Sequence, residues 1–424
     1  MSTTTVDVLI VGGGPAGALV AHGLAQQGLQ VLVIEAIDSS QATTSSRASP
    51  PNKPCGEFLA ARGVAVLGRR GLLPRILPWG QRLHHLTLAS ARGAMSADFP
   101  TPALGIRRSD LDRILLAAAA EQAEVWLGRR VSHVSRPADP TGPWRVQLSD
   151  RSIVEAAMLI GADGRHSSIR QETGLGRSLV HTGRHALVVH ARGVRDCAGG
   201  EMHLGGYGQI GLCPLPPSPP RYDVAAADGG GTDEANINLL LSPRGSAQLG
   251  RMGTADLLRA GIAATPTLAH RLRRATFLDS VTAVAHLRQQ PWRVSGHRIA
   301  LVGDAALCSD PFTGDGMSNA LEDAELLVAC MAHWPGALRT HALNAYGQAH
   351  HQIRRRQRIE TLALPAVLDR FRLGTAIVAG LAHAGLGSSI IGRRHRRLDV
   401  HPLVAAHPAS PLDRINQRLV STAP

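Results

Sequence analysis

A lysine, a thiol and a carboxyl group lie close together near the start of the chain, in SRASPPNKPCGEFLAARG (residues 46–63). Lys53 is the only lysine among 45 cationic side chains. Cys55 could act as a nucleophile or a proton donor, and Glu57 as a general acid or base. Either these groups flank a bound cofactor or substrate, or the segment is a surface turn that leads into a helix, where Glu57 would complement the helix dipole.

Two aspartates follow short apolar strands farther along the chain. MLIGADGRHSSIR places Asp163 after one strand, and RIALVGD places Asp304 after another. A carboxylate at a strand end can accept hydrogen bonds from ligand hydroxyl groups. After Asp304, Gly-Asp-Gly-Met (residues 314–317) begins a long predicted helix, whose first N–H groups can stabilise negative charge on a ligand. Asp163, with the glycine that follows it, would by itself also fit a strand and a turn.

The elements that would position these groups begin at the N-terminus. Val6–Val11 predicts a buried parallel strand, GGGPAG follows, Ala18–Gln27 predicts a helix, and Val31–Ile34 predicts a second strand that ends in an acid. This order is typical of a fold that binds a dinucleotide. The loop and helix N-terminus would bind the pyrophosphate, and the acid would bind ribose hydroxyls. The predicted residues are Gly12, Gly14, Pro15, Ala16, Gly17, Glu35 and Ala36.

These three segments, in this order, resemble a superfamily of FAD-dependent oxidoreductases that includes the aromatic hydroxylases (single-component FAD monooxygenases) and the geranylgeranyl reductases. The resemblance runs from residue 6 to about residue 345. It implies FAD as cofactor, with NAD(P)H as a transient reductant, because the sequence has no second dinucleotide motif. Beyond the first loop, it assigns FAD contacts to Arg47, Arg108, Val131, Asp163, Gly164, Gly303, Asp304, Pro311, Gly314, Gly316 and Met317.

Two further segments resemble the geranylgeranyl reductases in part. KPCGE is similar to their Cys-Gly segment, which implies that Lys53, Cys55 and Glu57 lie beside the flavin as catalytic candidates. GGYGQIGLCP lacks the tryptophan and phenylalanine of their aromatic segment, which argues against an isoprenoid reductase. The same stretch places Tyr207 and Gln209 at the predicted substrate wall.

The expected fold is α/β, with a Rossmann-type FAD-binding domain, an inserted antiparallel β-sheet substrate domain and C-terminal helices. Segments 1–80, 100–178 and 288–345 form the first domain, 81–99 and 179–287 the second, and 346–424 the helical region. Within that last region, the apolar stretch Gly374–Gly392 predicts helices that cover the substrate cavity. Its flanking arginines leave contact with an anionic membrane surface as an alternative.

Composition limits the classes of partner. The net charge of +13 favours anionic partners, but the basic clusters have no interleaved aromatic residues, so nucleic acid is not predicted. Five cysteines without a C-x-x-C pair predict neither a disulfide framework nor a metal site. The N-terminus has no secretory pattern, so a cytoplasmic location is expected, with contact at the inner membrane face as the alternative.

Three functions follow from this sequence. The first is a monooxygenase that uses NAD(P)H and O2 to hydroxylate an apolar aromatic or polyketide-like molecule. The second is a flavin-dependent reductase or dehydrogenase of a C=C bond. The third is a non-catalytic flavin-binding or membrane-docking protein. The oligomeric state is left open.

Overall fold

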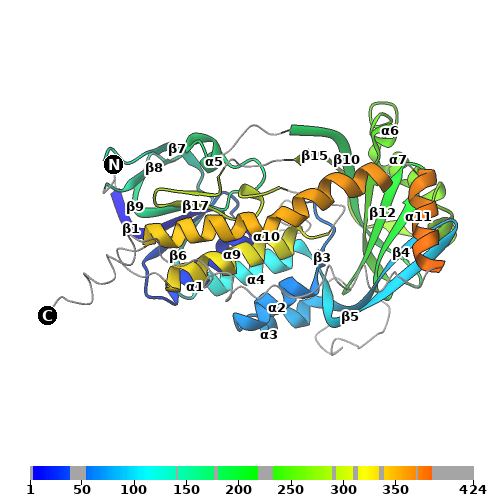
Figure 1. The fold of residues 1–424 in the computed structure, drawn as a ribbon, viewed down its shortest axis with the longest axis horizontal. Helices are drawn as coiled ribbons and strands as arrows, with labels where there is room; N and C mark the ends of the chain where they lie inside the picture. The colour runs from blue at the N-terminus through cyan, green and yellow to red at the C-terminus, as the bar shows by residue number, and fades with distance from the viewer. Residues whose placement is uncertain are drawn as a thin grey trace.

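The computed structural model describes residues 3–38, 54–139, 142–175, 180–217, 233–288, 293–308, 314–333, 339–368 and 371–383. The predicted site residues Arg47, Lys53 and Pro311 lie outside these ranges. Figure 1 shows two sheets side by side, with the long helix α10 (Arg339–Leu368) running along both. The predicted α/β fold with a second sheet is confirmed.

The first sheet has the strand order β16-β17-β9-β1-β2-β6, and β8 and β7 extend it beside β9. Its parallel strands β2 and β17 are buried throughout and β1 and β9 along their carboxyl ends, whereas the edge strand β6 is partly exposed. The strands are β1 (Thr3–Val11), β2 (Val31–Glu35), β6 (Glu124–Leu127), β7 (Val131–Ser135), β8 (Trp144–Leu148), β9 (Ile153–Gly161), β16 (Ser295–Gly296) and β17 (Ile299–Leu301).

Helices surround this sheet and start at its carboxyl edge. Helix α1 begins at Pro15, three residues before the predicted start, because a proline suits the first position of a helix. The elements on this side are α1 (Pro15–Ala25), α2 (Ala61–Arg69), α3 (Leu73–Ile76), η2 (Leu77–Trp79), α4 (Arg108–Ala120), α5 (Ser168–Glu172), η3 (Gly303–Ala305) and α9 (Gly316–His333).

The second sheet has the order β14-β10-β13-β12-β11-β4-β5-β3, with β15 beside β10. All its described pairs are antiparallel except β11 with β4, which run parallel, so the predicted antiparallel sheet is a mixed one. Strand β5 continues to Ile106, beyond the predicted end at residue 99. The strands are β3 (Phe58–Leu59), β4 (Gly80–Ser90), β5 (Gly93–Ile106), β10 (Val180–Arg192), β11 (Gly200–Gly205), β12 (Gly208–Leu215), β13 (Glu234–Leu241), β14 (Thr276–Phe277) and β15 (Thr282–Arg288).

The two faces of the second sheet differ, because side chains alternate along each strand. One face packs into an aliphatic core with α7 (Thr254–Ala263) and α8 (Pro266–Ala269). The other face carries a smaller apolar cluster of Ala186, Val188 and Leu240, with Met202 packed against it. Helix α6 (Pro243–Ser246) follows β13.

Helix α11 (Phe371–His383) packs on β4, β5 and β11, where its Val378 contacts Leu204 and Leu88. It therefore covers part of the second sheet. That this apolar stretch, whose residues 384–392 lie outside the described part, covers a substrate cavity stays a prediction. Contact of this stretch with a membrane surface stays a prediction. Among the described residues, no helix has both the length and the apolar character needed to cross a membrane.

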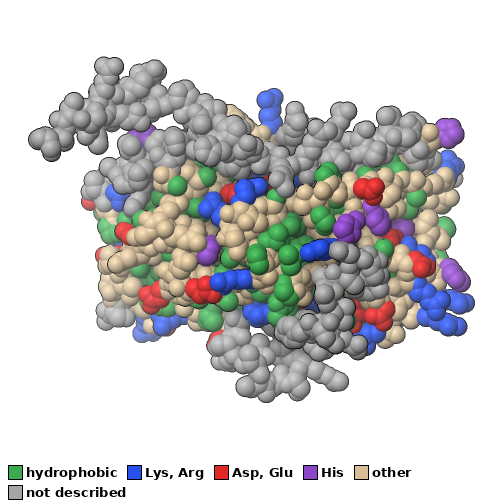
Figure 2. Space-filling model, turned by 90° about the horizontal axis from the view of Figure 1, so that it is seen from below, with side chains coloured by type: hydrophobic (Ala, Val, Ile, Leu, Met, Phe, Trp, Pro, Cys, Tyr) green, Lys and Arg blue, Asp and Glu red, His purple; other side chains and the backbone are tan. Residues whose placement is uncertain are grey.

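The surface charge is dispersed on the face shown in Figure 2. Basic side chains stand there singly or in small groups, several beside acidic ones, and hydrophobic side chains gather near the centre of the view. This face therefore offers no continuous basic strip in the described residues.

Candidate functional site

The loop after β1 is built for close backbone approach. Gly12 has a φ of 104°, and a Cβ added there would lie 2.4 Å from the carbonyl oxygen of Ala162. A Cβ on Gly17 would lie 1.9 Å from the carbonyl oxygen of Gly12. Gly14 differs, since a Cβ there would meet only an Arg108 guanidinium nitrogen, at 3.7 Å. The loop thus presents backbone to an open space bordered by a cation, which suits a pyrophosphate.

Glu35 ends β2 and holds this loop in place. Its Oε2 accepts a hydrogen bond from Gly13 N (2.7 Å), and its Oε1 accepts one from Ile37 N (3.0 Å). The backbone carbonyl of Glu35 accepts from Arg129 N (3.1 Å), which brings the segment before Val131 alongside. Contact of Glu35, Ala36 and Val131 with the adenosine part of a dinucleotide stays a prediction.

The structure brings the other two motifs to the same place. A Cβ on Gly303 would lie 3.1 Å from the Cβ of Ala16, so η3 packs against the start of α1. Arg170 is fully buried and donates to the carbonyls of Ala305 (2.9 Å) and Arg165 (2.7 Å). Three segments predicted separately therefore form one site at the edge of the first sheet.

Two acids have different surroundings in this site. Asp163 Oδ2 accepts from Ser168 Oγ and Ile169 N, both at 3.1 Å, so it caps α5, and Gly164 beside it has a φ of 80°. The Asp304 carboxylate makes no hydrogen bond with any described residue and is partly exposed. Burial raises the pKa of Asp304, while Arg165 and Arg108 oppose that shift. Asp304 is therefore the acid available to ligand hydroxyl groups.

Arg108 stands between this site and the second sheet. Its Nε donates to Asp112. Burial lowers the pKa of Arg108, but Asp112 and its other neighbours raise it by more, so Arg108 stays a cation. Arg108 and Asp112 are four positions apart on α4, so their side chains lie on one face of the helix. Arg107 turns away and pairs with Glu234 of the second sheet (2.6 Å).

Helix α9 begins under the same space. Gly314 has a φ of 65°, a Cβ on Gly316 would meet no atom of a described residue within 4 Å, and Met317 is buried. The first N–H groups of a helix have no acceptor within it, so those of α9 are available to an anion. The start of α9 thus offers donors beside open space.

Buried ion pairs hold α9 on two sides. Arg62 of α2 contacts Asp315 (2.6 Å) and Glu322, and Arg354 of α10 contacts Asp323 (2.6 Å) and Glu322 (3.1 Å). Burial alone would lower the pKa of Arg62, but Asp315 and Glu322 raise it. The network fixes the helix start from both neighbouring helices, and the sequence motifs did not indicate it.

Taken together, these groups fit FAD. The glycine loop matches a pyrophosphate, Glu35 stands at a strand end for ribose, Asp304 can accept from ribityl hydroxyls, and α9 offers N–H groups to a ring edge that carries negative charge. When bound, FAD supplies the electron transfer that side chains cannot perform.

The segment around Cys55 lies where this site meets the second sheet. Residues 54–57 form neither helix nor strand and lead into β3, and the next helix begins only at Ala61, so the helix predicted as an alternative does not begin there. Asn236 Nδ2 of β13 donates to the Cys55 carbonyl (2.9 Å). The residue Cys55 as a whole is partly exposed. Burial raises the pKa of its thiol, and Arg108 opposes that shift. Of the two predicted roles, this environment favours the proton donor over the thiolate.

Glu57 is 2% exposed and has a φ of 56°, a region that a non-glycine residue rarely adopts. Its Oε1 accepts from Arg108 N (2.8 Å), so Glu57 does complement a helix dipole, but that of α4 and not of the following helix. Its Oε2 lies 2.8 Å from His190 Nε2 and accepts from Asn236 Nδ2 (3.2 Å). A catalytic role for Cys55 and Glu57 stays a prediction.

His190 carries this network on to the surface. Its Nδ1 lies 2.6 Å from Asp279 Oδ2, in the turn after β14. Burial by itself would lower the pKa of His190, but the hydrogen bonds to Asp279 and Glu57 raise it to about 9. Sequence reasoning missed His190 and Asp279, since twenty histidines gave no spacing that selected one.

The two predicted substrate-wall residues lie in different places. Tyr207, in the turn before β12, packs against the core shared with α7 and α8. Gln209 lies on the face that meets Cys55 and accepts from Arg184 Nη2 (3.2 Å). Asn236 and Asn238 lie on that face as well, two residues apart on β13. Their alternation with apolar residues in ANINLLL was the sequence signal that could have identified them.

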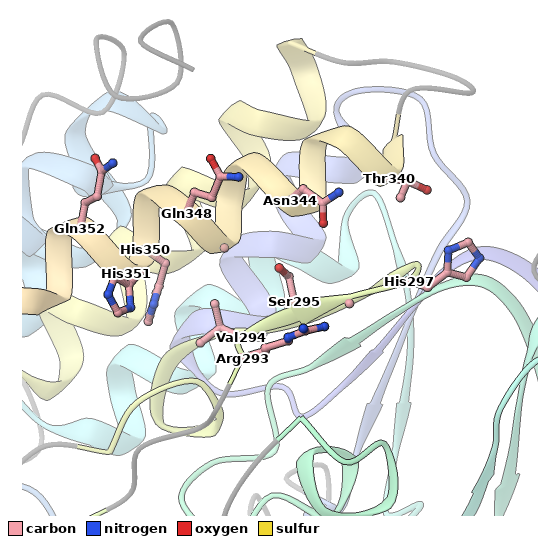
Figure 3. Close-up of a pocket in the computed structure, with 12 residues that line it drawn as sticks. Arg293, Val294, Ser295, His297, Thr340, Asn344, Gln348, His350, His351 and Gln352 are labelled. Atoms are coloured by element: carbon pink, nitrogen blue, oxygen red, sulfur yellow. The ribbon is translucent and has the colours of Figure 1, made fainter. Parts of the chain in front are cut away.

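A separate hollow of about 710 Å³ lies between α10 and the residues around β16. Figure 3 shows Ser295 and Val294 beneath the helix, with His350 and His351 on the helix beside them. No residue predicted to bind cofactor or substrate lines this hollow, so it lies apart from the candidate site.

Comparison with known proteins agrees with this geometry. Residues 5–203 match the family described as FAD binding domain. A ubiquinone hydroxylase, UbiL of Rhodospirillum rubrum, is 31% identical over 405 residues, which cover 90% of this chain and 85% of that protein. A menaquinone reductase of Mycolicibacterium smegmatis is 29% identical, over 89% of this chain and 88% of that protein.

Solved structures support the fold. PqsL of P. aeruginosa, solved with 2-aminobenzoylacetate, aligns with a TM-score of 0.71 at 20% identity, over 88% of this chain and 99% of that chain. A geranylgeranyl bacteriochlorophyll reductase-like protein of Thermoplasma acidophilum aligns with a TM-score of 0.70 at 19% identity, over 98% and 99%. The chain therefore belongs to the superfamily of FAD-dependent oxidoreductases that includes the aromatic hydroxylases and the geranylgeranyl reductases.

Proposed function

We propose that this FAD-dependent oxidoreductase is an NAD(P)H-dependent monooxygenase that hydroxylates an apolar ring compound, aromatic or polyketide-like. The observation that carries the proposal is the face of the second sheet that meets Cys55. It places the apolar side chains of Ala186, Val188 and Leu240 beside the amides of Asn236 and Asn238. Apolar walls with a few polar groups are typical of sites for small apolar molecules.

The residues have separate tasks in this proposal. Arg108 and the glycine loop (Gly12–Gly17) hold the phosphates, and Asp304 holds the ribityl chain. The apolar wall displaces water and orients the substrate ring. Asn238 is partly exposed on the same face and can bond a polar substituent of the ring. Cys55, kept as a thiol, can donate a proton at the boundary of the two sheets.

The relatives favour ring hydroxylation. Besides UbiL, a kynurenine 3-monooxygenase of Salinispora arenicola is 27% identical over 81% of this chain and 75% of that protein. The names of UbiL and the menaquinone reductase refer to quinones, so a lipid quinone is a reasonable first probe. NAD(P)H is the usual reductant of such enzymes, and O2 would be the co-substrate.

The test uses FAD-loaded protein with NADH or NADPH, a short-chain naphthoquinone and 4-hydroxybenzoate as probes. We expect oxygen uptake with a probe and one ¹⁸O atom in the product when ¹⁸O2 is supplied. A product with two added hydrogens and no oxygen label would instead identify a C=C reductase. Absence of flavin reduction by either nucleotide, with every probe, would leave the flavin-binding protein as the function.

The apolar wall can be tested separately. Val188→Asn places an amide in the apolar cluster, and we expect the KM for an accepted probe to rise at least about tenfold, since a buried unpaired polar group costs roughly 1–3 kcal/mol. FAD content should stay at the parent level, because Val188 belongs to the second sheet. An unchanged KM would remove this face from the substrate site.

A further inference from the structure

Three titratable side chains form a line of hydrogen bonds from the surface to the candidate site. Asp279 is 39% exposed, and its Oδ2 lies 2.6 Å from His190 Nδ1. The His190 side chain is 11% exposed, and its Nε2 lies 2.8 Å from Oε2 of Glu57, which is 2% exposed. We call these residues the carboxylate–histidine chain. Each member is more buried than the one before it.

The inner end of this chain lies at the boundary where Cys55 and Arg108 meet. Glu57 N donates to Cys55 Sγ (3.3 Å), and Glu57 Oε1 accepts from Arg108 N (2.8 Å). Arg108 in turn borders Gly14 of the glycine loop. The negative charge of Glu57 also acts on Cys55, since it raises the pKa of the thiol. A change of charge on Glu57 would therefore be felt at Cys55.

While Glu57 and Asp279 are both ionised, the geometry requires a charged imidazole. Both ring nitrogens of His190 face carboxylate oxygens, which accept hydrogen bonds and cannot donate while ionised. Only the imidazolium donates from both nitrogens at once. The backbone N–H of His190 donates to the other oxygen of Asp279 (3.0 Å), which holds the outer carboxylate in position.

We propose that the carboxylate–histidine chain stores one proton beneath the site and that His190 passes it to Glu57 during turnover, an inference that rests on the proposed oxidoreductase function. In this step the Nε2–H bond of His190 breaks and an O–H bond forms on Oε2 of Glu57. His190 becomes a neutral imidazole with its proton on Nδ1, held by Asp279. The reverse transfer restores the imidazolium, so the carboxylate–histidine chain neither gains nor loses a proton in this step.

The consequence lies at Cys55. With the proton on Glu57, one negative charge leaves the neighbourhood of the thiol, which then gives up its proton more readily to the bound substrate. Glu57, His190 and Asp279 are positioning residues in this scheme, since they act through Cys55. They come from the Cys55 segment, β10 and the bend after β14, and the contact of Glu57 with Arg108 N joins them to the start of α4.

Among the described residues, few other charged groups lie near the carboxylate–histidine chain. Arg107 acts on Asp279, and Glu57 acts on Asp110 of α4. Glu234, two residues along β13 from the strand partner of His190, is paired with Arg107 and Arg192. Asn236 is neutral and bonds Glu57. Asp279 is therefore the substitution that changes His190 while leaving the buried end of the chain intact.

The experiment compares FAD-loaded parent with Asp279→Asn, Asp279→Glu and the control Asp256→Asn, an exposed acid on α7. ¹⁵N-histidine NMR gives the titration of His190, and turnover over pH gives the alkaline limb. We expect both near pH 9 in the parent, and both lower by about one pH unit in Asp279→Asn, because a carboxylate beside the ring is lost. Asp279→Glu should restore both, and Asp256→Asn should change neither.

Photochemical reduction of the bound FAD gives a readout that needs no substrate. At pH 8, the Asp279→Asn protein should take up more protons from solvent for each FAD reduced than the parent protein. In the parent, the carboxylate–histidine chain already holds its proton at this pH. Equal uptake, or an alkaline limb that stays while the His190 titration moves, would overturn the proton store. Absence of turnover with any probe, but with altered proton uptake, would count against the proposed function and support the store.

Discussion

At the edge of the first sheet the site consists of backbone, whereas on the second sheet it consists of amide and charged side chains. The glycine loop leaves no room for a Cβ at Gly12 or Gly17. The face of β10 and β13 presents His190, Asn236 and Asn238, which bond to Glu57, to the Cys55 carbonyl or to each other. The first arrangement depends on shape and the second on charge, so different perturbations should break them.

The largest effect on FAD affinity should come from Gly17→Ala. Its Cβ would lie 1.9 Å from the carbonyl oxygen of Gly12, and both partners are backbone, so neither can turn aside. We expect FAD affinity to fall at least about a hundredfold, or roughly 2.7 kcal/mol, together with a lower melting temperature. Isothermal titration of the apoprotein with FAD measures this.

Gly250→Ala is the matched control, since a Cβ there meets nothing within 4 Å. It should bind FAD like the parent. If Gly17→Ala also does, the first sheet does not depend on the close approach seen in the loop.

The next effect tests the buried network that holds α9 beside both sheets. Arg62→Leu leaves Asp315 without this partner in the interior, and loss of one member of a buried ion pair costs about 3–5 kcal/mol. Chemical denaturation should show this loss. Arg75→Leu removes an exposed pair with Glu121 and should leave stability almost unchanged. Equal losses in both variants would show that burial does not decide the strength of these pairs.

Backbone requirements could be predicted from the sequence because they leave a local pattern. The spacing from Gly12 to Glu35 depends on one turn, one helix and one strand, all close along the chain. Asp163 and Asp304 were identified by the strands that precede them. The structure adds that Arg170 joins these two motifs, through hydrogen bonds to Ala305 and Arg165.

The charged face of the second sheet could not be predicted in the same way. Glu57 and His190 are 133 residues apart in the chain, and His190 and Asp279 are 89 apart. Their contact depends on how β10 aligns with the Cys55 segment and the turn after β14, which no local pattern specifies. The alternative in which Glu57 complements the dipole of the helix that follows it differs from the structure, where its carboxylate accepts from the first N–H of α4.

Raising the pH should weaken the second sheet's contacts and leave the glycine loop unaffected. The pKa of His190 rises from 6.5 to about 9 on folding, so its contribution to stability is complete below pH 6.5 and is lost as the pH rises through about 9. The shift corresponds to at most about 3 kcal/mol. Asp279→Asn should flatten the fall in unfolding free energy between pH 6.5 and 9, and Asp256→Asn should not. Parallel curves for all three proteins would contradict this account.

The smallest effect concerns Asp304, the carboxylate of the first sheet's site that accepts no hydrogen bond from a described residue. If that site depended on backbone shape alone, Asp304→Ala would bind FAD like the parent. We expect a loss of about 1.5–3 kcal/mol in FAD affinity, because a hydrogen bond to a charged acceptor is removed from the ribityl chain. The protein should keep its melting temperature without FAD, since burial raises the pKa of Asp304 and its charge is not favourable to the empty fold. Asp98→Ala, an exposed acid on β5, is the control for titration and thermal unfolding. An unchanged FAD affinity in Asp304→Ala would mean that the first sheet binds through backbone alone, which would make the contrast between the two sheets complete.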